Sequence, residues 1–400
     1  MEYIKEKAKT IPVYGEYDVV VAGGGIAGVS AALAAKRTDA KVLLLEKQFM
    51  LGGLATLGII TIYLPLCDGM GKQVSFSIAE ELFHLSMKYG YESKYPKPWL
   101  ENGTLDEKKN TRFEVQFSAN VYAVLLEKLL LEEGVEILYG TSVCDTIVSR
   151  QKINSIIIEN KSGRSAVKCK SVVDATGDAD VCHLSGEKTD EFKQGNVLAG
   201  WYYFVENGKY NLKMLGWSDI PEKFKTEEQK RLEKSLKRYK GLDAKELTDM
   251  VCTSHAYTLD DFLKNGNYSM ERSLSLMATI PQIRMTRKIV SDYSIDDTEM
   301  HKEFKDSVGM FSDWRKCGPV YELPFSCLYG KNIKNLITAG RCISVTEAMW
   351  DITRVIPVCA VSGQAAGTAA AMSSNFKTLS INKLQQQLKK DGVILHEKDL

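Results

Sequence analysis

Short apolar runs alternate with helix-like stretches along most of the chain, which is typical of an α/β protein. The first run is Val19–Val21, and Val42–Leu45 follows after an alanine-rich stretch that predicts a helix. Apolar runs at 135–139 and 172–174 predict two further strands. Because parallel strands covered on both faces have few polar residues, these runs favour a parallel sheet between layers of helix.

Three β-rich runs at 143–148, 153–159 and 165–168 lie between those last two strands. The linkers Arg150–Lys152 and Asn160–Gly163 are typical of hairpin turns. The runs therefore predict an antiparallel β-meander that leads into the buried strand ending at Asp174.

The remaining patterns predict helices and loops that divide the chain. Helices are expected at 77–89, 121–133, 226–238, 244–263, from Pro357 onward and at 381–390, with an apolar loop at 57–75 and an exposed excursion at 90–112. Residues 181–330 contain aromatic-rich strands but no glycine-rich nucleotide turn, so they are expected to form an inserted α+β substrate domain. The predicted division is 1–180 with 331–375, the insert 181–330, and a C-terminal helix and tail at 376–400.

Composition narrows the class of protein. The 400 residues are 44% hydrophobic and carry a net charge of +1, so no strong field favours nucleic acid or an anionic membrane. Residues 19–35 are apolar, but three consecutive glycines and the acids Glu16 and Asp18 argue against a membrane span. The nine cysteines include no C-x-x-C pair, which fits a reducing compartment, with the cytoplasm as the default. No metal-ligand spacing occurs, so no metal site is predicted.

The chemical signal begins at Gly23, Gly25 and Gly28, spaced as G-x-G-x-x-G between the first strand and helix. Gly23 permits the tight turn, Gly25 lets a pyrophosphate approach the backbone, and Gly28 lets the helix pack closely. The helix N-terminus then offers free N–H groups to the phosphates. Glu46 ends the next strand, where a carboxylate can accept hydrogen bonds from ribose hydroxyls and disfavours a 2′-phosphate. The ligand is therefore expected to be of the NAD or FAD type.

The full set of motifs resembles the FAD-dependent oxidoreductases of the glutathione-reductase-like superfamily. The match rests on the glycine turn with Glu46, Gly52–Gly53 with Thr56, Asp174–Asp180, Pro281–Arg287, and the A-G-R-x-x-S stretch Ala339–Ser344 running on to Arg354 and Gly363–Gly367. These stretches are spread over residues 17–372, so the resemblance spans nearly the whole chain. The family often has an acid between the two arginines of the fourth stretch, whereas this chain has Met285.

The resemblance implies a Rossmann-like domain holding a non-covalent FAD. Its adenosine would lie at the glycine turn and Glu46, with Val143 at the adenine. Its flavin would lie at the helix that begins near Pro357. The implied cofactor contacts are Gly23, Gly25, Ile26, Ala27, Gly28, Glu46, Lys47, Gly52, Gly53, Leu54, Ala55, Thr56, Val143, Ala175, Thr176, Gly177, Asp178, Gly340, Arg341, Arg354 and Val355.

Arginine forks suit a carboxylate or a phosphate, so Arg284, Arg287 and Arg354 are the candidates for binding an anionic organic substrate. Structural ion pairs are the other interpretation of the same arginines. Tyr321, Trp350 and Asp351 are weaker candidates for the pocket wall. Near the glycine turn only Cys67 occurs, without a partner, which disfavours disulfide reductase chemistry.

Three functions stay open at this point. The first is hydride transfer between a small organic substrate and FAD, with a separate electron acceptor or donor. The second is an NAD-binding enzyme of the thiazole-synthase type, which would use no flavin. The third is a non-catalytic electron-transfer flavoprotein subunit. A redox partner protein and a homo-oligomer are further open partners.

Overall fold

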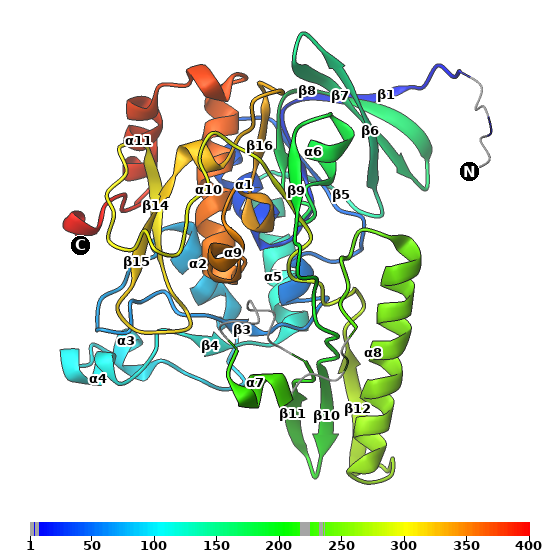
Figure 1. The fold of residues 1–400 in the computed structure, drawn as a ribbon, viewed down its shortest axis with the longest axis vertical. Helices are drawn as coiled ribbons and strands as arrows, with labels where there is room; N and C mark the ends of the chain where they lie inside the picture. Colours follow the sequence, from blue (N-terminus) through cyan, green and yellow to red (C-terminus); the bar gives the residue numbers. More distant parts are fainter. Residues whose placement is uncertain (1–3, 5–7, 217–224, 232–234, 236) are drawn as a thin grey trace.

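The computed structural model describes residues 4, 8–216, 225–231, 235 and 237–400. Its centre is a seven-stranded sheet with the order β5-β2-β1-β8-β7-β6, in which β16 also pairs with β8 (Figure 1). The parallel part comprises β1 (Val13–Ala22), β2 (Val42–Leu45), β5 (Glu136–Leu138), β8 (Gly163–Asp174) and β16 (Leu336–Thr338). The α/β class with a parallel sheet is confirmed.

The predicted β-meander is present as β6 (Ser142–Ser149), β7 (Lys152–Asn160) and the first half of β8. The prediction that 165–168 and 172–174 are separate strands was wrong, because both belong to β8. The first half of β8 pairs antiparallel with β7, and residues 172–174 pair parallel with β16. Strand β1 runs parallel beside both halves and keeps β8 continuous across the change of partner.

Helices α1 (Ile26–Arg37) and α10 (Ile356–Met372) pack directly on each other beside this sheet. Glycines remove the side chains at the contact: a Cβ at Gly363 would lie 2.3 Å from the Ala27 carbonyl oxygen, and one at Gly367 2.1 Å from that of Ala31. The predicted helices are also found as α5 (Ala119–Glu132) and α2 (Ile78–Ser86), which pack against each other on this side of the sheet.

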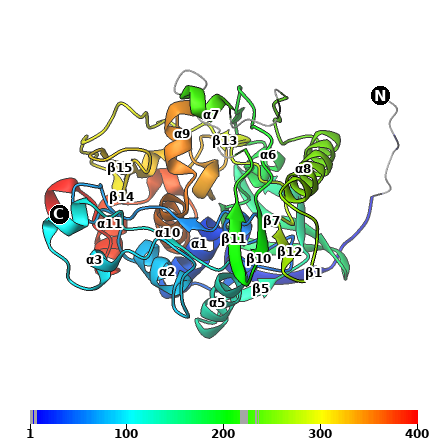
Figure 2. The same cartoon turned by 90° about the horizontal axis from the view of Figure 1, so that it is seen from below.

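Residues 181–330 separate into two parts. In the first part, β10 (Tyr202–Glu206), β11 (Lys209–Lys213) and β12 (Arg272–Met277) form a small sheet beside α8 (Ala244–Lys264), as Figure 2 shows from below. In the second part, β14 (Ser307–Ser312) and β15 (Val320–Pro324) pair with each other, and β14 packs on α10. Apolar side chains of this second part, such as Phe311 and Leu323, share one core with α1 and α10.

Within the described residues, the predicted helix at 226–238 is present as α7 (Glu227–Arg231). Residues 232–234 and 236 lie outside the described residues, and Lys237 and Arg238 are not helical. The helix does not reach these two residues because Tyr239 forms backbone hydrogen bonds in both directions with Asn196.

The remaining elements are short, and most of them link the larger ones. They are β3 (Ile62–Tyr63), α3 (Lys97–Leu100), α4 (Leu105–Lys109), β4 (Val115–Gln116), α6 (Asp180–Leu184), β9 (Thr189–Glu191), β13 (Arg287–Ile289), α9 (Glu347–Thr353) and α11 (Ile381–Lys390). Short 3-10 turns lie at Gly53–Ala55, Phe325–Cys327, Gly340–Cys342, Phe376–Thr378 and Glu397–Asp399. Within the described part of the chain, no single helix has the length and apolar character of a membrane span; α9 and α10 together meet those criteria as a pair bent by 92°.

Substitution Gly367→Ala tests the contact between α1 and α10. Alanine has the higher helix propensity, by about 1 kcal/mol, but its methyl group must push the backbones apart. We expect overpacking to lower the free energy of unfolding by about 1–3 kcal/mol, measured as a lower midpoint of thermal unfolding. Gln386→Ala on the exposed side of α11 is the control, and an unchanged midpoint for both variants would contradict the close contact.

Candidate functional site

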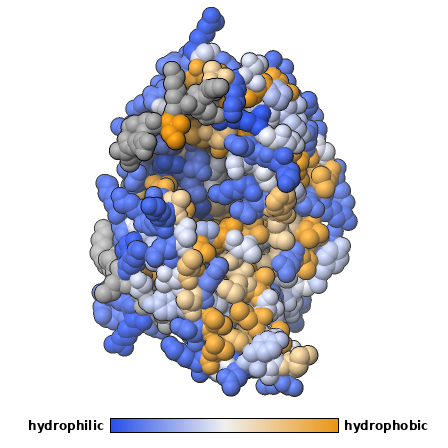
Figure 3. All heavy atoms as spheres, turned by 90° about the vertical axis from the view of Figure 1, so that its right-hand side faces the viewer, coloured by the Kyte–Doolittle hydropathy of each residue, from blue (hydrophilic) through white to orange (hydrophobic). Residues whose placement is uncertain are grey.

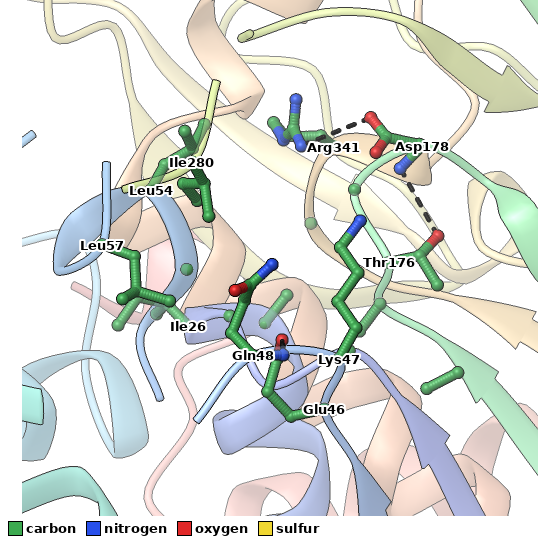
Figure 4. A pocket seen from close by; sticks show the side chains of 18 of the residues that line it. Ile26, Glu46, Lys47, Gln48, Leu54, Leu57, Thr176, Asp178, Ile280 and Arg341 are labelled. Atoms are coloured by element: carbon green, nitrogen blue, oxygen red, sulfur yellow. Dashed lines mark hydrogen bonds and ion pairs between the residues drawn. The ribbon is translucent and has the colours of Figure 1, made fainter. Parts of the chain in front are cut away.

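A cavity of about 460 Å³ lies at the carboxyl ends of the parallel strands. Its walls come from the ends of β1 and β2, the start of β6, the turn after β8, the first turns of α1 and α10, and the stretch that follows β12. In Figure 4, Leu54, Leu57 and Ile280 lie on one side, Arg341 and Asp178 lie on the other, and Lys47 extends toward Asp178. The side of the molecule that Figure 3 turns to the viewer has a hollow bordered by hydrophilic residues.

The three glycines of the first turn meet different surroundings. A Cβ at Gly23 would lie 2.5 Å from the Ala175 carbonyl oxygen, and one at Gly28 would lie 1.8 Å from that of Gly23. A Cβ at Gly25 would meet nothing within 4 Å, because this residue borders the cavity. Gly25 also caps α1 without a side-chain hydrogen bond, so the first N–H groups of this helix keep their capacity to donate to a ligand. Packing therefore requires Gly23 and Gly28, whereas Gly25 keeps the cavity open.

Glu46 is buried beneath the glycine turn, with 7% of its surface exposed. Its Oε2 accepts a hydrogen bond of 2.6 Å from the Gly24 N–H, and its Oε1 accepts one of 2.7 Å from the Gln48 N–H. The carboxylate thus ties the turn to the loop after β2 while it lines the cavity. Each oxygen keeps a second lone pair with which it can accept a hydrogen bond from a ribose hydroxyl.

Gly52 and Gly53 lie against the same turn. The Gly52 N–H donates to the Gly24 carbonyl oxygen over 2.8 Å, and both glycines have left-handed backbone conformations, with φ of 100° and 53°. This pairing brings Leu54 and Ala55 to the cavity wall. The predicted contact Thr56 instead donates its hydroxyl to the Leu51 carbonyl oxygen over 2.5 Å and does not border the cavity.

The opposite wall is organised by Asp174 at the end of β8, which is fully buried. Its carboxylate accepts hydrogen bonds from the Thr176 and Cys182 N–H groups, over 3.2 and 2.9 Å, which shapes the turn that carries Gly177 and Asp178. Arg341 packs directly on Gly177, so that a Cβ at position 177 would lie 2.2 Å from Arg341 Nη2. Arg341 Nη2 also forms an ion pair with Asp178 at 3.5 Å. This wall therefore offers a cation and an acid to the middle of the cavity.

The three candidate substrate arginines have separate surroundings. Arg284 is buried with its guanidinium 5.6 Å from the centre of the Trp201 ring, and it does not border the cavity. Arg287 pairs with Asp180 at 2.8 Å and donates to the Asp178 carbonyl oxygen at 2.9 Å. Arg354 alone among the three borders the cavity, with its Nε and Nη2 bound to Asp351 Oδ1 at 3.0 and 2.5 Å.

The other predicted residues also divide into those that border the cavity and those that do not. All the predicted cofactor contacts border the cavity except Gly28, Thr56 and Val355, the residue that caps α10. The weaker candidates for the pocket wall are all buried and do not border the cavity: Trp350, Tyr321 and Asp351. Met285, in the place of the family acid, is buried, and the Asn196 amide oxygen accepts a hydrogen bond from its backbone N–H.

The sequence interpretation missed several cavity residues. They are Ala22, Leu45, Gln48, Leu57, Thr141, Ser142, Asp180, Gly241, Leu247, Ile280, Pro281, Ile283, Ala339, Ile356 and Cys359. Most lie within a few positions of a predicted contact, so the motif positions could have been extended to include them. Gly241 and Leu247 lie far from every quoted motif, and only the folded chain brings them to the cavity.

The family model of FAD-dependent oxidoreductases matches residues 18–388. The chain belongs to this FAD-dependent oxidoreductase family. Membership of this family makes FAD the expected cofactor and favours a flavin-based function over the NAD-type interpretation.

The individual relatives match this chain over part of its length or at low sequence identity. The thioredoxin reductase of Ureaplasma parvum serovar 3 (strain ATCC 700970) is 30% identical over 161 residues, which are 38% of this chain and 50% of that protein. The chain thus matches about half the length of this curated relative. A geranylgeranyl bacteriochlorophyll reductase-like protein from Thermoplasma acidophilum is 14% identical, with 94% of this chain and 82% of that chain covered and a TM-score of 0.44. The open conformation of a flavocytochrome c3 fumarate reductase is 14% identical, with 90% and 79% covered and a TM-score of 0.44.

The residues of this FAD-dependent oxidoreductase fit the cofactor. The cavity runs from a ribose acceptor at Glu46, past the open backbone at Gly25, to the uncapped N-terminus of α10 at Ile356. Such helix ends favour negative charge. We expect the adenosine at Glu46 and Val143, the pyrophosphate at Gly25, and the flavin beside Arg354.

Substitution Gly25→Ala tests this fit, because a methyl group has room within the protein but intrudes on the cavity. We expect the apoprotein to keep its thermal midpoint while its affinity for FAD falls at least about tenfold, a loss of about 1.4 kcal/mol. Quenching of FAD fluorescence on titration with apoprotein measures the affinity. The matched variant Gly28→Ala should instead lower the thermal midpoint, and unchanged FAD affinity in Gly25→Ala would contradict the assignment.

Asp180 gives a prediction for pH dependence. Burial, together with the nearby Asp178 and Asp174 carboxylates, raises the pKa of Asp180 from 3.8 to about 6, against the opposing effect of Lys47 and Arg287. A raised carboxyl pKa means that the folded chain binds more protons than the unfolded chain, so stability falls as pH rises through this window. We therefore expect the thermal midpoint to fall less for Asp180→Asn apoprotein than for the parent apoprotein as the pH is raised from 4 to 6. Parallel curves would contradict the raised pKa.

Proposed function

We propose that this enzyme transfers a hydride between a small anionic organic substrate and non-covalently bound FAD, and that a separate molecule accepts or donates the electrons. The observation that carries the proposal is Arg354, a guanidinium on the cavity wall next to the N-terminus of α10. When bound, FAD supplies the redox chemistry, and the protein supplies binding, orientation and charge.

Arg354 has the donors to bind a carboxylate or phosphate group. A guanidinium has five N–H donors, and Asp351 accepts from Nε and Nη2 of Arg354. Within the described part of the chain, Nη1 has no hydrogen-bond acceptor. The anionic group of a substrate could therefore accept hydrogen bonds from Nη1 without displacing Asp351 from Nε and Nη2.

The surrounding wall favours a compact organic substrate. Leu57, Ile280 and Ile283 are apolar residues that border the cavity, and the last two lie in the predicted insert at 181–330. An apolar wall excludes water around the reacting atoms, which strengthens the interaction between a cation and a bound anion. We propose that this insert provides one face of the substrate site.

The thioredoxin reductase relative does not lead us to propose disulfide reduction. All nine cysteines of this chain are free, and none is separated from another by two residues as in the C-x-x-C motif. The cavity contains a single thiol, Cys359, whose pKa burial raises to about 12, so it is protonated and a poor nucleophile at neutral pH.

The test is a screen of small carboxylic and phosphorylated acids for anaerobic bleaching of the flavin absorption band. We expect an active acid to bleach the band of the parent holoenzyme, and Arg354→Met to raise the KM or substrate Kd at least about tenfold, as loss of a charged hydrogen bond predicts. Arg37→Met is the control, because Arg37 forms exposed ion pairs with Glu81 and Glu133 at the far end of α1.

Comparison with the amide or ester of the same acid decides the anion claim. Equal bleaching by the neutral compound, or an unchanged KM in Arg354→Met, would contradict anion recognition by this guanidinium. Bleaching by the acid alone would support it.

A further inference from the structure

Four charged side chains of alternating sign extend from the cavity wall into the protein behind the start of α10. Arg354 borders the cavity and binds Asp351 Oδ1 through Nε and Nη2, at 3.0 and 2.5 Å. Asp351 is fully buried on α9, and its Oδ2 lies 3.6 Å from Arg315 Nη1. Arg315 in turn binds both carboxylate oxygens of Asp313 at 3.0 Å, and Asp313 is also fully buried.

Neighbouring groups fix this row in place. The Trp314 indole N–H donates to the Asp351 carbonyl oxygen over 2.9 Å, and its ring centre lies 6.0 Å from the Arg354 guanidinium carbon. Arg112, from a distant part of the chain, donates to the Asp313 and Trp314 carbonyl oxygens over 3.4 Å. Because buried ion pairs lose much of their hydration, such an arrangement is costly unless geometry and hydrogen bonds compensate. The two arginines and the Trp314 indole provide such compensation, but Asp351 Oδ2 accepts no hydrogen bond from the described residues and has only the 3.6 Å ion pair with Arg315.

The order of charges determines the field at the cavity. Asp351 partly cancels the charge of Arg354, and Arg315 partly cancels the charge of Asp351. Removal of the Asp351 charge would therefore make the cavity wall more positive, whereas removal of the Arg315 charge would make it more negative. Because charges in a partly buried site are screened less than charges in water, we expect both changes to alter the potential at the cavity wall.

We propose that Asp351 and Arg315 are positioning residues that hold Arg354 against the flavin and thereby set the reduction potential of the bound FAD. The proposal rests on the proposed function in placing the flavin beside Arg354. A reduced flavin carries more negative charge than an oxidised one, so a more positive wall favours reduction and a more negative wall opposes it. Asp351 and Arg315 then tune the potential in opposite directions without contacting the cofactor.

The test is a spectroscopic redox titration of FAD-loaded protein against a dye of known potential, with no substrate present. We expect Asp351→Asn to favour the reduced form about tenfold and Arg315→Met to oppose it about tenfold, which is about 30 mV in each direction for a two-electron couple. Arg315→Lys, which keeps the charge, should restore most of the parent potential. Arg37→Met is the control at an exposed ion pair and should leave the potential unchanged.

A merely structural role predicts lower thermal midpoints for Asp351→Asn and Arg315→Met, with reduction potentials that are unchanged or that shift in the same direction in both variants. Either result would overturn the proposal. If Asp351→Asn does not fold, Arg315→Met and Arg315→Lys still decide the question, because only a change of charge should move the potential. No substrate enters this titration, so failure of the anionic-substrate proposal would leave its result readable. Loss of any shift together with unchanged substrate binding would refute this inference alone.

Discussion

The candidate site depends on the direct contact between α1 and α10. Gly363 and Gly367 leave no side chain between the helices, so the backbone of α10 approaches the carbonyl oxygens of α1. Both helices begin at the cavity, one at the capping residue Gly25 and the other at the capping residue Val355. A small shift between them would therefore change the distance between the two ends of the cavity. Packing between the two helices thus sets the shape of the cavity, because Ala27, which Gly363 contacts, also borders it.

Strand β8 carries the second constraint. Its pairing with β7 in one half and with β16 in the other joins the meander to the last strand of the sheet, and β1 lies beside both halves. The strand ends in Asp174, whose carboxylate binds the N–H groups of Thr176 and Cys182. The glycine turn of this wall thus depends on a buried acid, much as the first turn depends on Glu46. In both places a carboxylate supplies the hydrogen bonds that a tight turn cannot make within itself.

Much of this architecture could be predicted from the sequence because it depends on local rules. Short, mainly apolar runs predicted β1, β2, β5 and the end of β8, and the spacing of Gly23, Gly25 and Gly28 predicted the turn between strand and helix. The exceptions involve partners that are distant in the chain. Strand β8 looked interrupted because its middle is polar, and only its lateral pairing makes it continuous. The predicted insert looked like one unit, although β14 belongs to the core beside α10.

The arginines show where sequence reasoning about a site stops. Their type indicates anion binding, but the partner of each determines whether its charge reaches the cavity. The acid that binds Arg287 lies more than a hundred positions away in the chain, whereas Asp351 lies three positions before Arg354 and could have been anticipated from helical spacing. Because α9 ends beside α10, this local pair faces the cavity on one side and Arg315 on the other. A local ion pair thus gains its position on the cavity wall from the junction of α9 and α10.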